Sequence, residues 1–193
     1  MKKILALCAL ALLLSACDKF ASKPVAFNSV DITGAQYASQ FALTDHTGKA
    51  RTLADFKGKV VFLFFGFTQC PDVCPTTMTE LAAVMKALGP DADKVQVLFV
   101  TVDPERDTKE LLSQYVPAFH PAFLGLSGDA AATATTGKEF KVFYAKVAGT
   151  GANYSMDHTA ASYVFDRDGK IRLYVRPDQS VEQITHDIKL LLD

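Results

Sequence analysis

The hydrophobic pattern places two buried strands and a helix near the middle of the chain. Residues 59–67 and 94–102 are almost continuously apolar, which is typical of parallel strands that are buried on both faces. A strand–helix–strand unit of this length predicts a parallel pair with a right-handed crossover. The helix between them ends at Gly89-Pro90, and its apolar positions recur at helical spacing, at Leu81, Val84, Met85 and Leu88.

Shorter patterns on either side predict further elements. Glycine-containing turns favour two β-hairpins, one over residues 41–53 and one over residues 160–175 around the turn 166–169. The other expected elements are helices over residues 107–116, 129–139 and 180–192, and strands over residues 123–126 and 140–147. The pattern therefore predicts an α/β domain.

The first residues have the features of an export signal. Lys2 and Lys3 precede an apolar run, as in secretory signal peptides. The run ends at residues 14–17 in the sequence Leu-Ser-Ala-Cys, which resembles the lipobox of bacterial lipoproteins. This resemblance implies cleavage before Cys17 and attachment of lipid to that residue. The alternatives are an ordinary signal peptide with an incidental cysteine, or an uncleaved apolar stretch that acts as an anchor.

These features divide the chain into three parts. We expect residues 1–16 to be a lipoprotein signal peptide, residues 17–26 to be a polar tether, and residues 27–193 to form the folded domain. Asp18 directly follows the lipidated cysteine, which resembles a signal for retention at the inner membrane. The expected location is the cell envelope, with the domain lipid-anchored on the periplasmic face of the inner membrane.

Charge and length narrow the class of protein. The net charge of the whole chain is −1. The sequence has neither a basic patch nor an aromatic RNA-binding motif, which disfavours nucleic acid as a partner. A length of 193 residues allows one domain with a sizeable core.

Two cysteines four residues apart are the most informative feature of the expected domain. Cys70 and Cys74 follow the first central strand and precede its helix. On a helix, positions i and i+4 share a face, close enough for a disulfide or for one soft metal ion. The helix N-terminus favours the thiolate form, and a disulfide closing so short a loop would add little stability. The pair is therefore a redox pair, a metal clamp, or both.

A dithiol that ends a strand and opens the next helix is the thioredoxin arrangement. We therefore expect a thioredoxin-like fold with an extra N-terminal β-hairpin and an insertion between Thr101 and Lys146. A generic thioredoxin has a cis-proline just before the strand that faces its dithiol. Here residues 156–159 contain no proline and include His158. A metal-capable side chain at this place favours metal binding over redox chemistry alone.

Three segments together resemble the signature of the Sco/SenC family. They are residues 66–75 (GFTQCPDVCP), 102–108 (VDPERDT) and 157–159 (DHT), in the order found in the family. The resemblance covers roughly residues 40–192. It implies a membrane-tethered copper-binding protein that helps to build the dinuclear copper centre of cytochrome c oxidase, with the copper-receiving subunit of the oxidase as partner. The resemblance places the copper ligands on Cys70, Cys74 and His158.

The chemistry of these residues agrees with the resemblance. Thiolates are soft ligands that select Cu(I), and imidazole suits Cu(I) and Cu(II) alike. A closed structural zinc site needs four protein ligands, and only three candidates converge here. Met156 is more simply explained by packing than by copper binding. The other histidines are in settings that suggest no metal site: His46, His120 and His186.

Several roles remain open for the dithiol. We expect a binding and delivery protein rather than an enzyme, with copper passed on by ligand exchange. A thiol–disulfide oxidoreductase that reduces the cysteines of the target subunit is the main alternative, and a thiol peroxidase or redox sensor is a third. In the redox reaction Cys70 is expected to be the more exposed sulfur. Asp72 either orients a ligand or favours the helix N-terminus by its charge.

One further sequence pattern superficially suggests a metal site. Asp166 opens a D-x-D-G sequence like that of a calcium-binding loop. Pro177 stands where such a loop needs glutamate, and the pattern predicts no flanking helices. We therefore interpret residues 166–169 as a hairpin turn and reject calcium.

Overall fold

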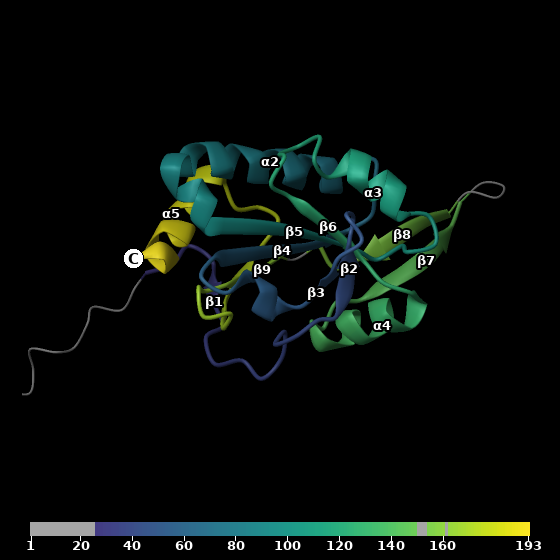
Figure 1. Ribbon diagram of the computed structural model, residues 1–193, viewed down its shortest axis with the longest axis horizontal. Coiled ribbons are helices and arrows are strands. Elements are labelled where there is room, and N and C mark those ends of the chain that lie inside the picture. Colours follow the sequence, from purple (N-terminus) through teal and green to yellow (C-terminus); the bar gives the residue numbers. More distant parts are fainter. Residues whose placement is uncertain (1–25, 150–153, 161) are drawn as a thin grey trace, which may run out of the picture.

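The computed structural model describes residues 26–149, 154–160 and 162–193. The expected signal peptide and Cys17 lie outside the described residues. The main feature is an eight-stranded sheet in the order β1-β10-β9-β4-β5-β6-β2-β3 (Figure 1). Its strands are β1 (Val30–Asp31), β2 (Leu43–Asp45), β3 (Ala50–Arg51), β4 (Val60–Gly66), β5 (Val95–Thr101), β6 (Leu124–Ser127), β9 (Ser162–Phe165) and β10 (Ile171–Val175).

The two central strands are parallel and in register. Residues 60–66 of β4 pair one to one with residues 95–101 of β5, and every residue of both strands is buried. Adjacent side chains of a strand point to opposite faces, so Phe64 and Phe65 fill the core on the two sides of the sheet. The ring of Phe65 lies 5.3 Å from that of Phe140, just after a helix. These contacts explain why β4 has no polar face.

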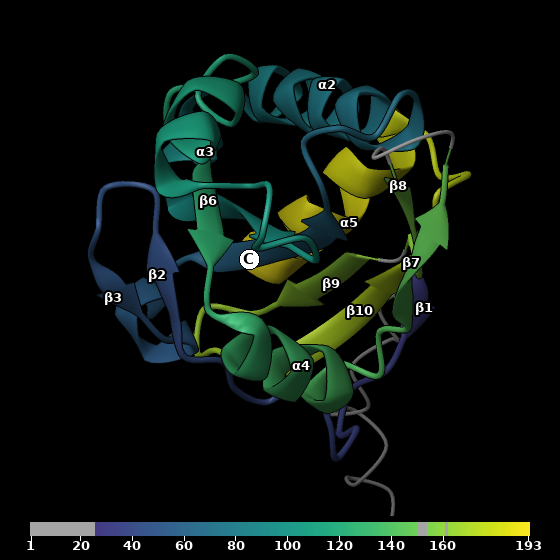
Figure 2. The same cartoon turned by 90° about the vertical axis from the view of Figure 1, so that its right-hand side faces the viewer.

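Helices cover both faces of the sheet. They are α2 (Val73–Leu88), α3 (Lys109–Tyr115), α4 (Ala130–Glu139) and α5 (Val181–Leu192), with 3-10 turns η2 (Leu53–Phe56) and η3 (Gly89–Lys94). α2 and α5 pack side by side, and α4 lies on the other side of the sheet from α2 (Figure 1, Figure 2). A strand, a dithiol turn and a helix thus form the predicted thioredoxin-like α/β arrangement.

Most predicted elements are confirmed, with shifts at their ends. The strand predicted over residues 140–147 begins only at Tyr144, because Phe140 is buried at the end of α4 and Lys141 has a positive φ of 53°. This strand, β7 (Tyr144–Ala148), pairs with β8 (Tyr154–His158) in a separate two-stranded sheet. The pattern predicted neither β8 nor β1. The expected insertion supplies β6 to the central sheet.

The expected N-terminal hairpin, β2 and β3, extends the sheet beyond β6. Asp45 is buried, and its carboxylate accepts the N–H groups of Thr47 and Lys49 and the Nε–H of Arg51. Burial alone would raise the pKa of Asp45, but these hydrogen bonds outweigh it and hold the pKa well below its usual range. We call Asp45, Thr47, Lys49 and Arg51 the hairpin cluster.

The described chain begins beside the last helix. The backbone N–H groups of Asn28 and Ser29 donate to the carboxylate of Asp187 at 2.9 and 2.7 Å. Asp187 is buried in α5, so these bonds fasten the start of the domain to that helix. α5 lies at the left of Figure 1, while β7 and β8 lie at the right.

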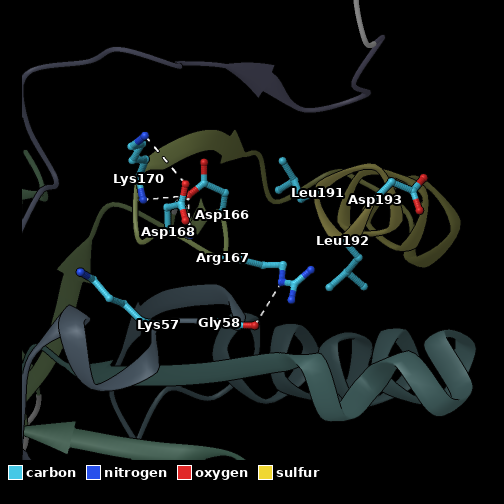
Figure 3. A pocket seen from close by; sticks show the side chains of 9 residues that line it. All are labelled: Lys57, Gly58, Asp166, Arg167, Asp168, Lys170, Leu191, Leu192 and Asp193. Carbon is cyan, nitrogen blue, oxygen red and sulfur yellow. Dashed lines mark hydrogen bonds and ion pairs between the residues drawn. The ribbon is translucent and has the colours of Figure 1, made fainter.

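The turn between β9 and β10 is closed by its first aspartate. Asp166 accepts the backbone N–H groups of Asp168 and Lys170 at 3.1 and 2.9 Å. Figure 3 shows this turn beside the end of α5, where Arg167 donates to the carbonyl oxygen of Gly58 at 3.2 Å. The Asp166 carboxylate therefore serves the hairpin turn expected from the D-x-D-G sequence.

None of the helices within the described residues is both long enough and apolar enough to cross a bilayer.

Candidate metal centre

The two cysteines lie in the turn from β4 to α2. Because α2 begins at Val73, Cys70 is in the preceding loop and Cys74 is in the first helical turn. The expectation that both cysteines share a helical face is therefore wrong, and the loop brings them together instead. The backbone N–H of Cys74 donates to the sulfur of Cys70 at 3.3 Å. Both residues are free thiols.

The two sulfur atoms differ in exposure. Cys74 is fully buried, whereas Cys70 is partly exposed, which confirms the expectation that Cys70 is more accessible. A glycine makes room for the buried sulfur, since a Cβ atom on Gly66 would lie 3.1 Å from the Cys74 Sγ and 2.9 Å from the Phe64 ring. A side chain at residue 66 would therefore crowd the sulfur as well as the Phe64 ring.

His158 comes to the dithiol from the other direction, as the last residue of β8. Its Nε2 lies 3.8 Å from the Sγ of Cys74. Its Nδ1 lies 3.1 Å from the carbonyl oxygen of Thr159, and a carbonyl can only accept, so Nδ1 carries the proton. The lone pair of Nε2 is therefore free to face Cys74, as in metal-binding histidines whose other nitrogen is held by a carbonyl group.

Burial keeps this pair uncharged in the metal-free protein. Burial raises the pKa of the Cys74 thiol far above its usual range, and burial lowers the pKa of His158. For Cys74 the expectation of a favoured thiolate is therefore wrong, because burial outweighs the helix N-terminus. A metal ion that binds here must displace the thiol proton, and the imidazole is already in its ligand form.

The distance between the two atoms fits a shared metal ion. Bonds of about 2.3 Å to sulfur and about 2.0 Å to nitrogen, the lengths found for zinc, place the two ligand atoms about 3.7 Å apart at an angle of about 120°. The observed 3.8 Å between Cys74 and His158 agrees with this. Across the described residues no three His, Cys, Asp or Glu side chains are grouped closely enough to hold a metal ion. The fitting distance is therefore that of one pair, Cys74 and His158, with Cys70 in the adjacent loop.

The turn after β5 supports the cysteine loop. Asp107 is buried and accepts the N–H of Thr68 at 3.0 Å and the hydroxyl of Thr101 at 2.6 Å. Burial raises the pKa of Asp107, although these hydrogen bonds oppose the change. We did not identify this support from the sequence. The available signal was an acidic segment after a strand that is parallel and adjacent to β4, since the carboxyl ends of such strands meet at one edge.

The other three histidines have partners outside this site. None is brought to the dithiol by a contact within the described residues, so the histidine chosen from the sequence is the one the fold places beside Cys74. Their partners are the N–H of Gly125 for His46 (3.0 Å), the N–H of Ala122 for His120 (3.2 Å) and the carboxylate of Asp187 for His186 (3.0 Å).

Two further residues near the site can be placed. Met156 is 7% exposed and belongs to the hydrophobic core, in agreement with the packing role expected for it. Asp72 is exposed and precedes α2, but its side chain makes no capping hydrogen bond. Its charge at the helix N-terminus remains one of the two roles expected for it.

Comparison with known proteins gives a consistent result. A family model described as SCO1/SenC matches residues 30–193. The mitochondrial SCO2 homolog of Bos taurus is 42% identical over 152 residues, which cover 77% of this chain and 57% of that relative. The chain thus spans little more than half the length of this mitochondrial relative.

Two solved structures show the same fold over most of the domain. Bradyrhizobium japonicum ScoI with copper bound is 44% identical, with a TM-score of 0.74, and the match covers 79% of this chain and 98% of that one. Apo Sco1 from Thermus thermophilus is 40% identical, with a TM-score of 0.78, covering 89% and 100%. These likenesses confirm the thioredoxin-like α/β fold. With the family model matching nearly all of the described residues, the chain belongs to the SCO1/SenC family.

Proposed function

We propose that this protein binds copper through Cys70, Cys74 and His158 and delivers it to the dinuclear copper centre of cytochrome c oxidase. The observation that carries the proposal is the pairing of a buried thiol with a free imidazole nitrogen at 3.8 Å, beside a second thiol. The copper-bound relative at 44% identity supports copper as the metal. BsSco, which shares the fold, is a member of the Sco family of cytochrome c oxidase assembly proteins.

Each ligand has a distinct part in delivery. Two thiolates and one imidazole form a soft set suited to Cu(I), and the imidazole also suits Cu(II). Cys74 and His158 are buried or half-buried and form the fixed side of the site. Cys70 is the accessible ligand, so an incoming ligand of the oxidase subunit exchanges first with its sulfur. Copper is thus cargo that leaves by stepwise ligand exchange.

The test is copper binding followed by transfer. Fully reduced protein is titrated with Cu(I) and Cu(II), and the loaded form is mixed with the metal-free copper-binding domain of the oxidase subunit. We expect a single copper ion per chain, thiolate-to-copper(II) charge-transfer absorption, and the spectrum of the dinuclear centre in the acceptor. A reduced protein that binds neither copper state would refute the proposal.

A second candidate function is thiol–disulfide exchange, favoured by the asymmetry of the two thiols. The accessible Cys70 would attack a disulfide of the target subunit as a thiolate, forming a mixed disulfide and releasing one target thiolate. Cys74 would then attack Cys70, forming the intramolecular disulfide and releasing the second target thiol. Two electrons pass from the dithiol to the target, which is left reduced. Reduction of the target by copper-free protein is the result expected for this function alone.

We propose further that the domain is held at the periplasmic face of the inner membrane by lipid on Cys17. The support is the Leu-Ser-Ala-Cys sequence after a basic and apolar start, followed by Asp18. A lipidated cysteine with several acyl chains anchors stably. Mass spectrometry of the mature N-terminus and fractionation of wild type and Cys17→Ala test this. An unacylated and freely soluble wild-type protein would contradict it and leave the copper site untouched.

A further inference from the structure

The strand that carries His158 has few ties to the rest of the domain. β8 pairs with β7 alone, and within the described residues this two-stranded sheet shares no ladder with the eight-stranded sheet. Figure 2 shows the two strands at the edge of the molecule. The chain after His158 leads into β9, which fixes one end of β8. The position of the other end depends on side-chain contacts.

Arg106 makes one of those contacts and also reaches the cysteine loop. Its Nη1 donates to the carbonyl oxygen of Tyr154, the first residue of β8, at 2.7 Å. The same nitrogen donates to the Oε1 of Gln69, the residue before Cys70, at 3.1 Å. One guanidinium therefore bonds to both segments that carry the proposed ligands.

The guanidinium is itself held in place by an ion pair and by an aromatic ring. Its Nε pairs with the buried carboxylate of Asp103, which also accepts the hydroxyl of Tyr154 at 2.8 Å. Its plane lies over the Tyr154 ring, 3.6 Å from the centroid. We call Gln69, Asp103, Arg106 and Tyr154 the site cluster. Such a planar, multiply bonded arrangement is one that lysine cannot reproduce.

An aromatic ring continues the chain of contacts to the ligand. The guanidinium of Arg106 lies 6.0 Å from the ring of Phe67, and that ring meets the His158 imidazole edge to face at 5.8 Å. The Nη2 of Arg106 is buried without a hydrogen-bond partner, and an unpaired buried donor is costly.

We propose that Arg106 is a positioning residue that sets the spacing between the dithiol and His158. The inference rests on the proposed function of these residues as copper ligands. Without Arg106, the Tyr154 end of β8 loses its bond to the cysteine loop and keeps only the Tyr154–Asp103 hydrogen bond, its pairing with β7 and the packing of Met156, and the imidazole no longer stays within reach of Cys74. Copper then keeps its two thiolates but loses its nitrogen ligand, which affects Cu(II) more than Cu(I) because thiolates alone suit Cu(I).

The first test needs no metal. In metal-free, reduced wild type we expect a nuclear Overhauser effect between the rings of Phe67 and His158, and in Arg106→Gln we expect it to be lost. The matched control is Arg51→Gln, since Arg51 also pairs with a buried aspartate and lies over a ring, that of Phe56. The control should retain the effect. Persistence of the ring contact in Arg106→Gln would overturn the proposal, whether or not the protein binds copper.

The second test is a double-mutant comparison of copper affinity. Changes to groups that orient a ligand typically weaken metal binding by about 10- to 100-fold, and we expect Arg106→Gln to weaken Cu(II) within that range. In a His158→Ala background the same change should have no effect. An equal loss in that background would show that Arg106 does not act through His158. If Arg106→Gln fails to fold, Arg106→Lys serves in both tests, because lysine retains the charge but cannot hydrogen-bond to both segments in the same way. We again expect loss of the ring contact and weaker Cu(II) binding.

Discussion

The hairpin cluster and the site cluster are each built on a buried aspartate that pairs with an arginine. The side chains of Arg51 and Arg106 are 17% and 18% exposed, and those of Asp45 and Asp103 are 0% and 1% exposed. Each guanidinium also lies over an aromatic ring. The two aspartate–arginine pairs are therefore almost the same in burial and in having an aromatic ring beside the guanidinium.

They differ in how far along the chain their bonds reach. The partners of Asp45 lie within six residues of it and close one hairpin. The bonds of the site cluster outside its own turn join residues 37 to 51 positions apart. A buried ion pair is weak evidence for stability by itself. The comparison shows that the same pair can shape a turn locally or align two distant segments.

The largest expected effect is a loss of copper affinity when a residue of the metal centre is changed, with no such loss when a residue near the hairpin cluster is changed. Cys70→Ala, Cys74→Ala and His158→Ala should each weaken copper binding by more than the about 10- to 100-fold typical of outer partners, because each removes a ligand. The control is His46→Ala, since His46 lies beside the hairpin cluster and bonds to Gly125. Titration with Cu(I) and Cu(II) checks this. Unchanged affinity in His158→Ala would show that the His158 nitrogen is not a copper ligand.

Oxidation should come next in size. A disulfide between Cys70 and Cys74 uses both thiolates, so the oxidised protein should bind copper poorly. Copper and oxidant should then compete for the same sulfurs, and copper loading should slow disulfide formation. Equilibrium dialysis of oxidised and reduced protein measures this. Equal affinity in the two forms would mean that the sulfurs are not the ligands.

The hairpin cluster should matter for stability and not for copper. Removing one partner of a buried pair costs about 3–5 kcal/mol, and because Arg51 keeps some exposure we expect about 3 kcal/mol for Asp45→Asn. The folded pKa of Asp45 is lowered, so its contribution is full above about pH 5 and is lost as the pH falls below the ordinary value of about 3.9.

Urea unfolding of wild type and Asp45→Asn at a series of pH values measures this. The gap between the two free energies of unfolding should narrow as the pH falls from 5 toward 2. A gap that stays constant over this range would show that the Asp45 charge is not the source of the stabilisation.

The smallest expected effect is on the stability and the copper(II) spectrum of two alanine variants, made at two glycines that have equally little space for a side chain. A Cβ atom would lie 2.9 Å from Phe64 at Gly66 and 2.9 Å from Leu43 at Gly128. Overpacking of this kind costs about 1–3 kcal/mol, so both alanine variants should be destabilised similarly. Only Gly66→Ala pushes against the Cys74 sulfur, and only it should alter the copper(II) spectrum. An unaltered spectrum would show that the sulfur does not depend on this space.

How much the sequence predicts varies with the kind of element. β4 and β5 were predicted because their side chains are buried on both faces, and this leaves a continuous apolar run. β8 was missed because the alternation of polar and apolar residues in Tyr-Ser-Met-Asp-His extends over only five positions. The pattern also did not reveal that β7 would pair with it. Its existence depends on pairing rather than on its own pattern.

The site divides in the same way. The two cysteines are close in sequence, and the histidine was found both from its place where a thioredoxin has its cis-proline and from the family resemblance, so all three were named before the geometry was known. Arg106 was quoted only as part of the family segment 102–108 and was given no role, because that role consists of bonds to residues 37 and 48 positions away. Local spacing carries no signal for such bonds. The position of Cys70 in the loop was missed because the start of a helix cannot be fixed to the residue from a pattern.

The bonds from Asn28 and Ser29 to Asp187 have a consequence for orientation. They fix the point where the chain enters the domain to α5, and Figure 1 shows α5 at one end of the molecule and β7 and β8 at the other. The chain at residue 26 therefore enters the domain at the end that lies away from the strand of His158. If that chain leads to a membrane, the end of the domain that carries β8 and His158 is the end farther from the point of attachment, so the proposed copper site faces away from the membrane surface.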